Sequence, residues 1–259
     1  MPTRQRRLGA AVAYVLVLAL VGLIACGNDD SPDENASAQS TETTAEPTTT
    51  SAAPTTTLPV VPTEDVTFTT GDGVDLVGRR YGEGTTAIVC SHMNQSSKAD
   101  FAAAGPLLAA EGFMVLAYDN RGDGESGQGL PADRVLDLLA AIDLVRARGA
   151  EQVVLLGASR GGTLSLDAAA QTTVDAIVTL SSPPPVAGPA AVAALTAPSL
   201  YVNSENDRFA DSTQEMFEAA NQPKEIEIYP GGDHGVALFV SEPGLVERIA
   251  AFISAQTAA

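Results

Sequence analysis

The sequence predicts one α/β domain with a mostly parallel central sheet and helices on both faces, and two observations lead to this prediction. From residue 66 onward, short β-branched and apolar runs alternate with longer helical stretches, which is the order of strands and crossover helices in such a sheet. The chain has 259 residues, and the first sixty or so do not resemble a folded domain. The remaining length suits one α/β domain and is too short for two of ordinary size.

Eight short strands are expected, beginning with a hairpin. Residues 66–69 and 74–77 flank Gly71-Asp72-Gly73, a composition typical of a hairpin turn. The six further strands are expected at 87–91, 113–118, 152–156, 176–180, 199–203 and 225–229. The helices are expected near 98–111, 132–148, 160–170, 212–220 and 244–256. Ser212 and Glu215 fit a capping box at the start of the fourth helix, and Pro243 is expected to open the last one.

The first 26 residues have the pattern of an export signal. Three arginines, Arg4, Arg6 and Arg7, precede an apolar run over 8–25, which ends in Leu23-Ile24-Ala25-Cys26. This ending resembles the lipobox of bacterial lipoproteins, and the resemblance implies that Cys26 becomes the lipid-carrying N-terminus. The alternative is an uncleaved transmembrane helix, since the run is close to the roughly 18–20 residues that span a bilayer. Both readings place the rest of the chain outside the cytoplasm, and we expect a lipid anchor on the extracytoplasmic face of the cell membrane.

Residues 27–63 consist almost entirely of Thr, Ser, Pro, Ala, Asp and Glu. A segment so poor in large apolar groups cannot bury enough surface to offset the entropy lost on ordering. We therefore expect a disordered linker that acts as a spacer, although its Thr-Pro clusters are also compatible with O-linked sugars. The folded domain is expected to occupy residues 64–259.

Composition argues against several classes of partner and site. Asp and Glu outnumber Lys and Arg by 32 to 14, and no segment gathers basic residues, so a nucleic-acid interface is not expected. The two cysteines, Cys26 and Cys90, lie in contexts too different for a disulfide. The two histidines, His92 and His234, have no nearby cysteine cluster with which to build a zinc site. We expect neither a metal nor an organic cofactor, and nothing in the sequence indicates an oligomeric state.

The sharpest local pattern is Gly157-Ala158-Ser159-Arg160-Gly161, a G-x-S-x-G between an expected strand and an expected helix. A strand-to-helix turn this tight forces the serine into a strained backbone conformation, and glycine on either side leaves room for the neighbouring chain. The Ser159 hydroxyl is thereby presented at a helix N-terminus. There the helix dipole and the backbone N–H of Arg160 face the negative charge that develops on a substrate oxygen.

A strand, a G-x-S-x-G turn and a helix, followed by an acid and then a histidine, resemble the α/β-hydrolase fold over roughly residues 64–257. The resemblance implies a serine hydrolase with a Ser-His-Asp triad, because a serine hydroxyl needs an adjacent base to take its proton. His234 lies in Gly231-Gly232-Asp233-His234-Gly235, after the last expected strand, where the family has its catalytic histidine. The other histidine, His92, ends an early strand.

Asp207 is the expected acid of the triad. It follows the strand 199–203 in a region similar to the family's G-x-x-D, although Ser204 stands where the family usually has glycine. Glu205 is the nearest competitor. Asp233 adjoins His234 in sequence and is badly placed to orient it, while Asp211 is expected to start a helix.

Residues 89–95 resemble the family's H-G-x loop, which supplies the second N–H of the oxyanion hole, with Met93 in place of the common glycine. The resemblance assigns the donor to the backbone of Asn94, with Met93 as the alternative, and makes His92 a prop for the loop rather than a second base. The segment 119–126 resembles the family's D-x-R-G-x-G-x-S loop, in which Arg121 and Ser126 hold the loop by hydrogen bonds. The side chain of Arg160 could attract an anion in the pocket, but a solvent-facing position is favoured.

Only residues 181–198 separate two expected strands at the place where this fold usually carries its lid. We therefore expect little or no lid and a pocket open to small, accessible substrates. Cys90 is expected to be a small core residue. The function expected from the resemblance is cleavage of carboxylic esters or related acyl compounds through an acyl-enzyme. Acyl transfer or peptide cleavage on the same triad, and a non-catalytic binding role at the cell surface, are the alternatives.

Overall fold

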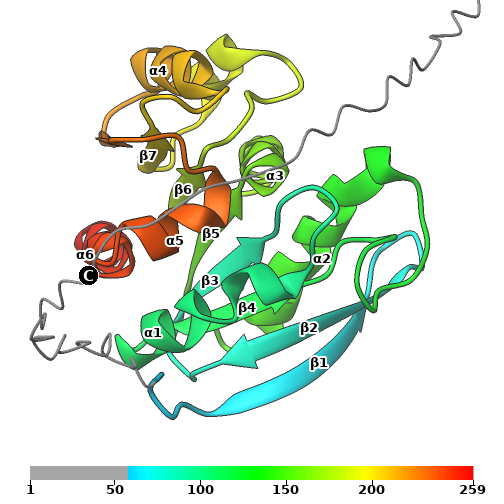
Figure 1. The fold of residues 1–259 in the computed structure, drawn as a ribbon. Coiled ribbons are helices and arrows are strands. Elements are labelled where there is room, and N and C mark those ends of the chain that lie inside the picture. Colours follow the sequence, from blue (N-terminus) through cyan, green and yellow to red (C-terminus); the bar gives the residue numbers. More distant parts are fainter. Residues whose placement is uncertain (1–57, 259) are drawn as a thin grey trace, which may run out of the picture. The chain divides into compact units, whose positions relative to one another are not determined.

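The computed structural model describes residues 58–258, and Figure 1 shows them as an eight-stranded sheet with helices on both faces. The expected signal segment with Cys26, and the expected linker up to residue 57, lie outside the described residues. None of the helices within 58–258 combines the length and the apolar character that crossing a bilayer requires.

The strand order in the sheet is β1-β2-β4-β3-β5-β6-β7-β8. β1 pairs antiparallel with β2, β2 pairs antiparallel with β4, and the remaining six strands are parallel. The strands are β1 (Thr63–Thr69), β2 (Asp75–Tyr81), β3 (Thr86–Ser91), β4 (Met114–Tyr118), β5 (Gln152–Ala158), β6 (Ala176–Leu180), β7 (Ser199–Ser204) and β8 (Lys224–Tyr229). Each expected strand is present, so the predicted α/β class is confirmed.

The helices cover both faces of the sheet, and the core is divided accordingly (Figure 1). On one face lie α1 (Ala104–Ala110), α5 (Leu238–Ser241) and α6 (Leu245–Thr257), and on the other lie α2 (Arg134–Ala147), α3 (Arg160–Ala169) and α4 (Ala210–Ala219). Successive strand residues pack on opposite faces: Ile88 belongs to the first core and Val89 to the second, and both are fully buried. Burial on both faces explains why these strands read as continuous apolar runs.

Parallel pairing brings the carboxyl ends of β3, β5, β7 and β8 to one edge of the sheet. Asn94, Ser159, Asp207 and His234 all lie in the segments that leave these ends. In open α/β sheets this edge is where ligands bind. The topology therefore places four widely separated parts of the sequence around one location.

The expected helix 98–111 is divided, which corrects the prediction. A 3₁₀ turn, η1, spans Lys98–Phe101, and α1 begins only at Ala104. A continuous α-helix would need an N–H at residue 106 for the carbonyl of Ala102, but residue 106 is a proline, which has no N–H and whose ring collides with that carbonyl. Pro106 is tolerated in the first turn of α1, where that N–H is not required.

Two expected start signals, Ser212 and Pro243, do not lie where their helices begin. α4 begins at Ala210, because the Asp207 carboxylate accepts the Phe209 N–H at 2.8 Å and its carbonyl accepts the Ala210 N–H, so Ser212 lies inside the helix and does not cap it. α6 begins at Leu245 after an N-cap at Gly244, and Pro243 precedes the helix.

The loop 119–126 is held by a buried arginine. Arg121 is 1% exposed, and its Nε and backbone N–H both donate to the carboxylate of Asp137, at 2.7 and 2.8 Å. Its two terminal nitrogens donate to Asp72, in the turn between β1 and β2, at 2.7 and 2.9 Å. Ser126 Oγ donates to the Asp119 carbonyl and accepts the Val77 N–H. These bonds match the expected role of Arg121 and Ser126.

Replacing Arg121 by Met is expected to lower the free energy of unfolding by about 3–5 kcal/mol, because the fully buried Asp137 carboxylate then loses its counter-charge. The double change Arg121→Met/Asp137→Leu is expected to recover most of the loss. Arg79→Met, which breaks the exposed pair with Asp65, is the control and is expected to cost under about 1 kcal/mol. Urea unfolding measures all three, and equal losses for Arg121→Met and Arg79→Met would contradict the assignment.

Candidate active site

Ser159 forms the turn between β5 and α3, and its backbone is strained. Its φ is 49° and its ψ is −121°, a conformation that non-glycine residues rarely adopt. A methyl group at Gly157 would overlap the backbone of Gly161, and one at Gly161 would overlap the carbonyl oxygen of Ser91 at the end of β3. The glycines on both sides of Ser159 are therefore needed for the chain to make this turn. The serine itself is 5% exposed and lines a cavity.

His234 and Asp207 form a hydrogen-bonded pair. The Nδ1 of His234 lies 2.6 Å from Oδ2 of Asp207, whose side chain is 3% exposed. Since a carboxylate oxygen accepts, this contact places the proton of a neutral imidazole on Nδ1 and leaves the Nε2 lone pair free. Nε2 is buried and has no hydrogen-bond partner among the described residues. Glu205, Asp211 and Asp233, the competing acids, make no hydrogen bond or ion pair with His234 within the same part of the chain.

The His234 loop packs against the Ser159 turn. Gly235 adopts a positive φ of 60°, and a methyl group there would lie 3.7 Å from Cβ of Ala158 and 2.6 Å from the sulfur of Met93. The loop that carries the His234–Asp207 pair thus meets both the residue before Ser159 and the loop after β3. Within 58–258 no hydrogen bond joins Ser159 to His234, so the structure brings the loops together without that bond.

In the loop after β3, the backbone N–H of Asn94 is free to donate, whereas that of Met93 is not. The Met93 N–H donates to Oδ2 of Asp100 at 3.0 Å, so it is already engaged. The Asn94 N–H has no acceptor among the described residues, and Asn94 lines the same cavity as Ser159 and Arg160. The Arg160 N–H belongs to the first turn of α3 and has no acceptor within the helix. This arrangement favours Asn94 over Met93 as the second donor.

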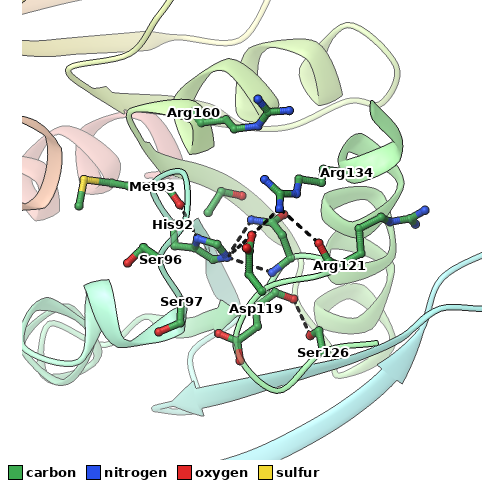
Figure 2. Close-up of polar contacts among 12 residues, drawn as sticks. His92, Met93, Ser96, Ser97, Asp119, Arg121, Ser126, Arg134 and Arg160 are labelled. Atoms are coloured by element: carbon green, nitrogen blue, oxygen red, sulfur yellow. Dashed lines mark hydrogen bonds and ion pairs between the residues drawn. The ribbon is translucent and has the colours of Figure 1, made fainter. Parts of the chain in front are cut away.

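His92 is enclosed in a network under this loop (Figure 2). It is 1% exposed, and its Nδ1 donates to the Met93 carbonyl at 2.6 Å. Its Nε2 accepts the backbone N–H of Asn120 at 3.0 Å. Close by, Arg134 forms an ion pair with Asp123 at 2.6 Å. With both ring nitrogens engaged by the backbone, His92 fits the expected role of a prop for the loop.

The cavity beside Ser159 has a volume of about 760 Å³ and is largely apolar. Part of its lining is the face of α3 that carries Thr163, Leu164 and Asp167, and other parts come from the loop before α2, the segment after β6 and the start of α4. Most of these lining residues were not singled out from the sequence, among them Asp167, Pro183, Pro184, Val186, Arg208 and Phe209. For Arg208 and Phe209 a signal was present, since they directly follow Asp207.

Two charged residues, Arg160 and Asp167, are among those that line this largely apolar cavity. Arg160 lines the cavity, which corrects the expectation that its side chain faces solvent. Asp167 lies on the same wall, where burial raises the pKa of its carboxyl group although the Val186 N–H donates to it. Cys90, by contrast, is fully buried in the core, and burial raises the pKa of its thiol, as expected of an inert core cysteine.

The segment between β6 and β7 carries no lid. It contains one 3₁₀ stretch, η3 (Pro189–Ala194), and Pro183 and Pro184 at its start line the cavity. The side chain of Val186 is 89% exposed. The connection thus forms part of the cavity wall and does not cover the cavity, as its short length predicted.

Comparison with known proteins agrees with this architecture. The family model described as "alpha/beta hydrolase fold" matches residues 86–220, just over half of the chain. Over 108 residues the chain is 40% identical to a curated mouse protein, serine hydrolase BPHL, in a match that covers 39% of this chain and 36% of the mouse protein. The chain thus spans about a third of that relative's length.

Solved structures share the fold at low sequence identity. The Pyrococcus furiosus esterase Pf2001 superposes with a TM-score of 0.67 at 18% identity, covering 75% of this chain and 92% of the esterase. The α/β hydrolase GrgF from Penicillium sp. sh18 gives 0.68 at 19% identity, covering 77% of this chain and all of GrgF. The match of the family model, supported by the sheet topology, shows that the chain belongs to the α/β-hydrolase fold family.

Proposed function

We propose that this protein is a serine hydrolase that cleaves carboxylic esters or related acyl compounds, with Ser159 as nucleophile, His234 as general base and Asp207 as the acid that orients it. The observation that carries the proposal is the state of His234. Its Nδ1 is held by a buried carboxylate, its Nε2 is buried without a partner, and its loop packs against the Ser159 turn. A base that is oriented on one side and unoccupied on the other is what activation of a serine requires.

In the proposed reaction, His234 Nε2 takes the proton of the Ser159 hydroxyl while Oγ attacks the ester carbonyl. The Asp207 carboxylate stabilises the imidazolium that forms. The carbonyl oxygen becomes an oxyanion between the N–H groups of Arg160 and Asn94, where the positive end of the α3 dipole adds to its stabilisation. His234 then protonates the leaving alcohol, and a water activated by His234 releases the acid from the acyl-enzyme.

The titles of several structural neighbours name esterases, which supports ester hydrolysis, and the name of the mouse relative, a serine hydrolase, supports a serine nucleophile. The cavity is compatible with ester cleavage, because a largely apolar space of about 760 Å³ next to Ser159 accommodates a small acyl or alcohol group. No residue of the described chain forms a lid that would enclose a long acyl chain.

We further propose that the chain is exported and anchored to the extracytoplasmic face of the cell membrane through lipid on Cys26. Residues 27–63 would then act as a tether for the domain at 64–259. The basic N-terminus, the apolar run and the Leu23–Cys26 ending support this proposal.

Ser159→Ala is expected to abolish labelling by a fluorophosphonate probe and to lower kcat for short nitrophenyl esters by at least about 10³-fold, because no other hydroxyl replaces the nucleophile. His234→Ala is expected to lower kcat to a similar extent. Ser254→Ala, an exposed serine on α6, is the matched control and is expected to label normally. Labelling that persists in Ser159→Ala would contradict the assignment.

His92→Ala is expected to lower kcat by about 10- to 100-fold with a smaller change in KM, because the loop that carries the Asn94 N–H loses both of its anchors to the ring. His92→Gln, whose amide oxygen can accept the Asn120 N–H, is expected to restore part of the loss. If kcat is unchanged while the melting temperature falls, His92 supports the fold and not the oxyanion site.

Export and cleavage are expected to leave a mature protein that begins at Cys26 with a lipid attached. Mass spectrometry of the membrane-bound protein from a bacterial host would measure this. Cys26→Ser is expected to prevent attachment of the lipid, whereas Cys90→Ser is expected to leave lipid attachment unchanged. An intact segment 1–25 in the membrane-bound protein would contradict lipoprotein processing.

A further inference from the structure

Two arginines in the described domain lack the ion-pair partner that most other basic residues have. Residues 58–258 contain eleven arginines and lysines, and eight of them lie within 4.0 Å of a carboxylate oxygen. Of the remaining three, Lys224 donates to the carbonyls of Phe217 and Glu218 at the end of α4. The other two, Arg160 and Arg208, have no carboxylate partner in this part of the chain.

Both of these arginines line the cavity that contains Ser159. Arg160 makes one long contact, from Nη2 to the Pro131 carbonyl at 3.4 Å, and its Nε is buried without a partner. Figure 2 shows Arg160 on its helix together with Arg134, and Arg134, unlike Arg160, forms an ion pair, with Asp123. The unused donors of Arg160 therefore lie at the cavity that holds the proposed nucleophile.

Arg208 is exposed and lines the same cavity. Its guanidinium lies 4.8 Å from the centre of the Phe209 ring, and that ring lies 5.8 Å from the ring of His234. Stacking on Phe209 holds the arginine without using its hydrogen-bond donors. Arg160 directly follows Ser159 in the sequence, and Arg208 directly follows Asp207. Both arginines are therefore next to residues of the proposed triad.

A shortage of acids does not explain these unpaired charges, because Asp and Glu exceed Lys and Arg by 32 to 14 in this chain. A buried donor without an acceptor costs free energy, so an unpaired Arg160 Nε is unfavourable until a ligand occupies it. A guanidinium presents a planar set of donors that matches a carboxylate in a two-bond geometry. The chemistry of the two side chains therefore fits a carboxylate anion in the cavity.

Resting on the proposed function, we propose that Arg160 and Arg208 determine specificity for esters that carry a carboxylate group close to the scissile bond. Asp167, the acidic group on the same wall, lies seven residues after Arg160 on α3, roughly 10 Å along the helix axis. It also accepts a hydrogen bond from the Val186 N–H. Its charge therefore lies about two helical turns along α3 from Arg160.

The test compares a neutral ester with its anionic analogues. The neutral ester is 4-nitrophenyl butyrate; 4-nitrophenyl hemiglutarate carries a carboxylate on the acyl side, and 4-carboxyphenyl butyrate carries one on the alcohol side. The ratio of kcat/KM for an anionic ester to that for the neutral ester is expected to fall at least tenfold in the variant Arg160→Gln/Arg208→Gln, mainly through KM. The anionic ester whose kcat/KM ratio falls more shows whether the carboxylate binds on the acyl side or on the alcohol side.

Arg79→Gln removes the same charge from the exposed surface and is the control, with an unchanged ratio expected. Arg160→Lys keeps the charge without the planar fork and is expected to retain part of the preference. High salt is expected to reduce the preference of the parent enzyme, because screening weakens an electrostatic contribution at an open site.

A binding measurement separates this inference from the proposed hydrolysis. Calorimetric titration of glutarate into Ser159→Ala is expected to give at least tenfold weaker binding when Arg160→Gln and Arg208→Gln are added. Equal glutarate binding, or an unchanged ratio in both ester arms while the parent is labelled by fluorophosphonate, would overturn the inference and leave the hydrolase intact. Arginine-dependent glutarate binding in a protein that neither labels nor hydrolyses the neutral ester would support the anion site and contradict the proposed hydrolase.

Discussion

The contact between the end of β3 and the start of α3 constrains everything around the site. At Gly161 no side chain fits, because the carbonyl of Ser91 occupies its position, and at Gly157 the backbone of Gly161 does the same. This close approach forces Ser159 into its positive φ and fixes the loop after Ser91 beside it. The same loop then carries His92, buried under it, and Asn94, on the cavity. A proposed nucleophile and a proposed oxyanion donor are therefore positioned by one backbone contact between the end of β3 and the first turn of α3.

The charges of the domain fall into two groups with different physical roles. In one group, Arg121 with Asp137 and Arg134 with Asp123 hold buried loops, and their charges are satisfied inside the protein. Asp119 belongs with them: burial would raise its pKa, but hydrogen bonds from Glu125 and Lys98 outweigh burial and lower it. The cavity arginines form the other group, whose partners the domain does not supply. At this one cavity of an acidic domain, the two guanidinium groups can bind an anionic ligand.

Sequence reasoning reached the features that are local and missed those that depend on tertiary contacts. The strands, the strained serine turn and the late histidine loop each have a signature in a few consecutive residues. The division of the expected helix 98–111 into η1 and α1 could also have been predicted, since Pro106 has no N–H to donate to the Ala102 carbonyl. The apolar spacing of the segment favoured one continuous helix instead. The start of α4 depends on the Asp207 carboxylate, which serves both Phe209 and His234, and the cavity side of Arg160 depends on segments from 131 and 183 onward. No local pattern contains such information.

The cavity arginines also affect the energetics of the proposed reaction. A guanidinium close to Ser159 favours the oxyanion and disfavours the imidazolium of His234, so the two effects oppose each other. Asp207 limits the second effect, because its buried carboxylate lies 2.6 Å from Nδ1 of the ring and supplies an opposite charge there. The imidazolium therefore keeps a counter-charge beside it while the guanidinium groups favour the oxyanion. The same field holds an anionic product acid, so faster acylation of a carboxylate-bearing ester is accompanied by slower release of its product.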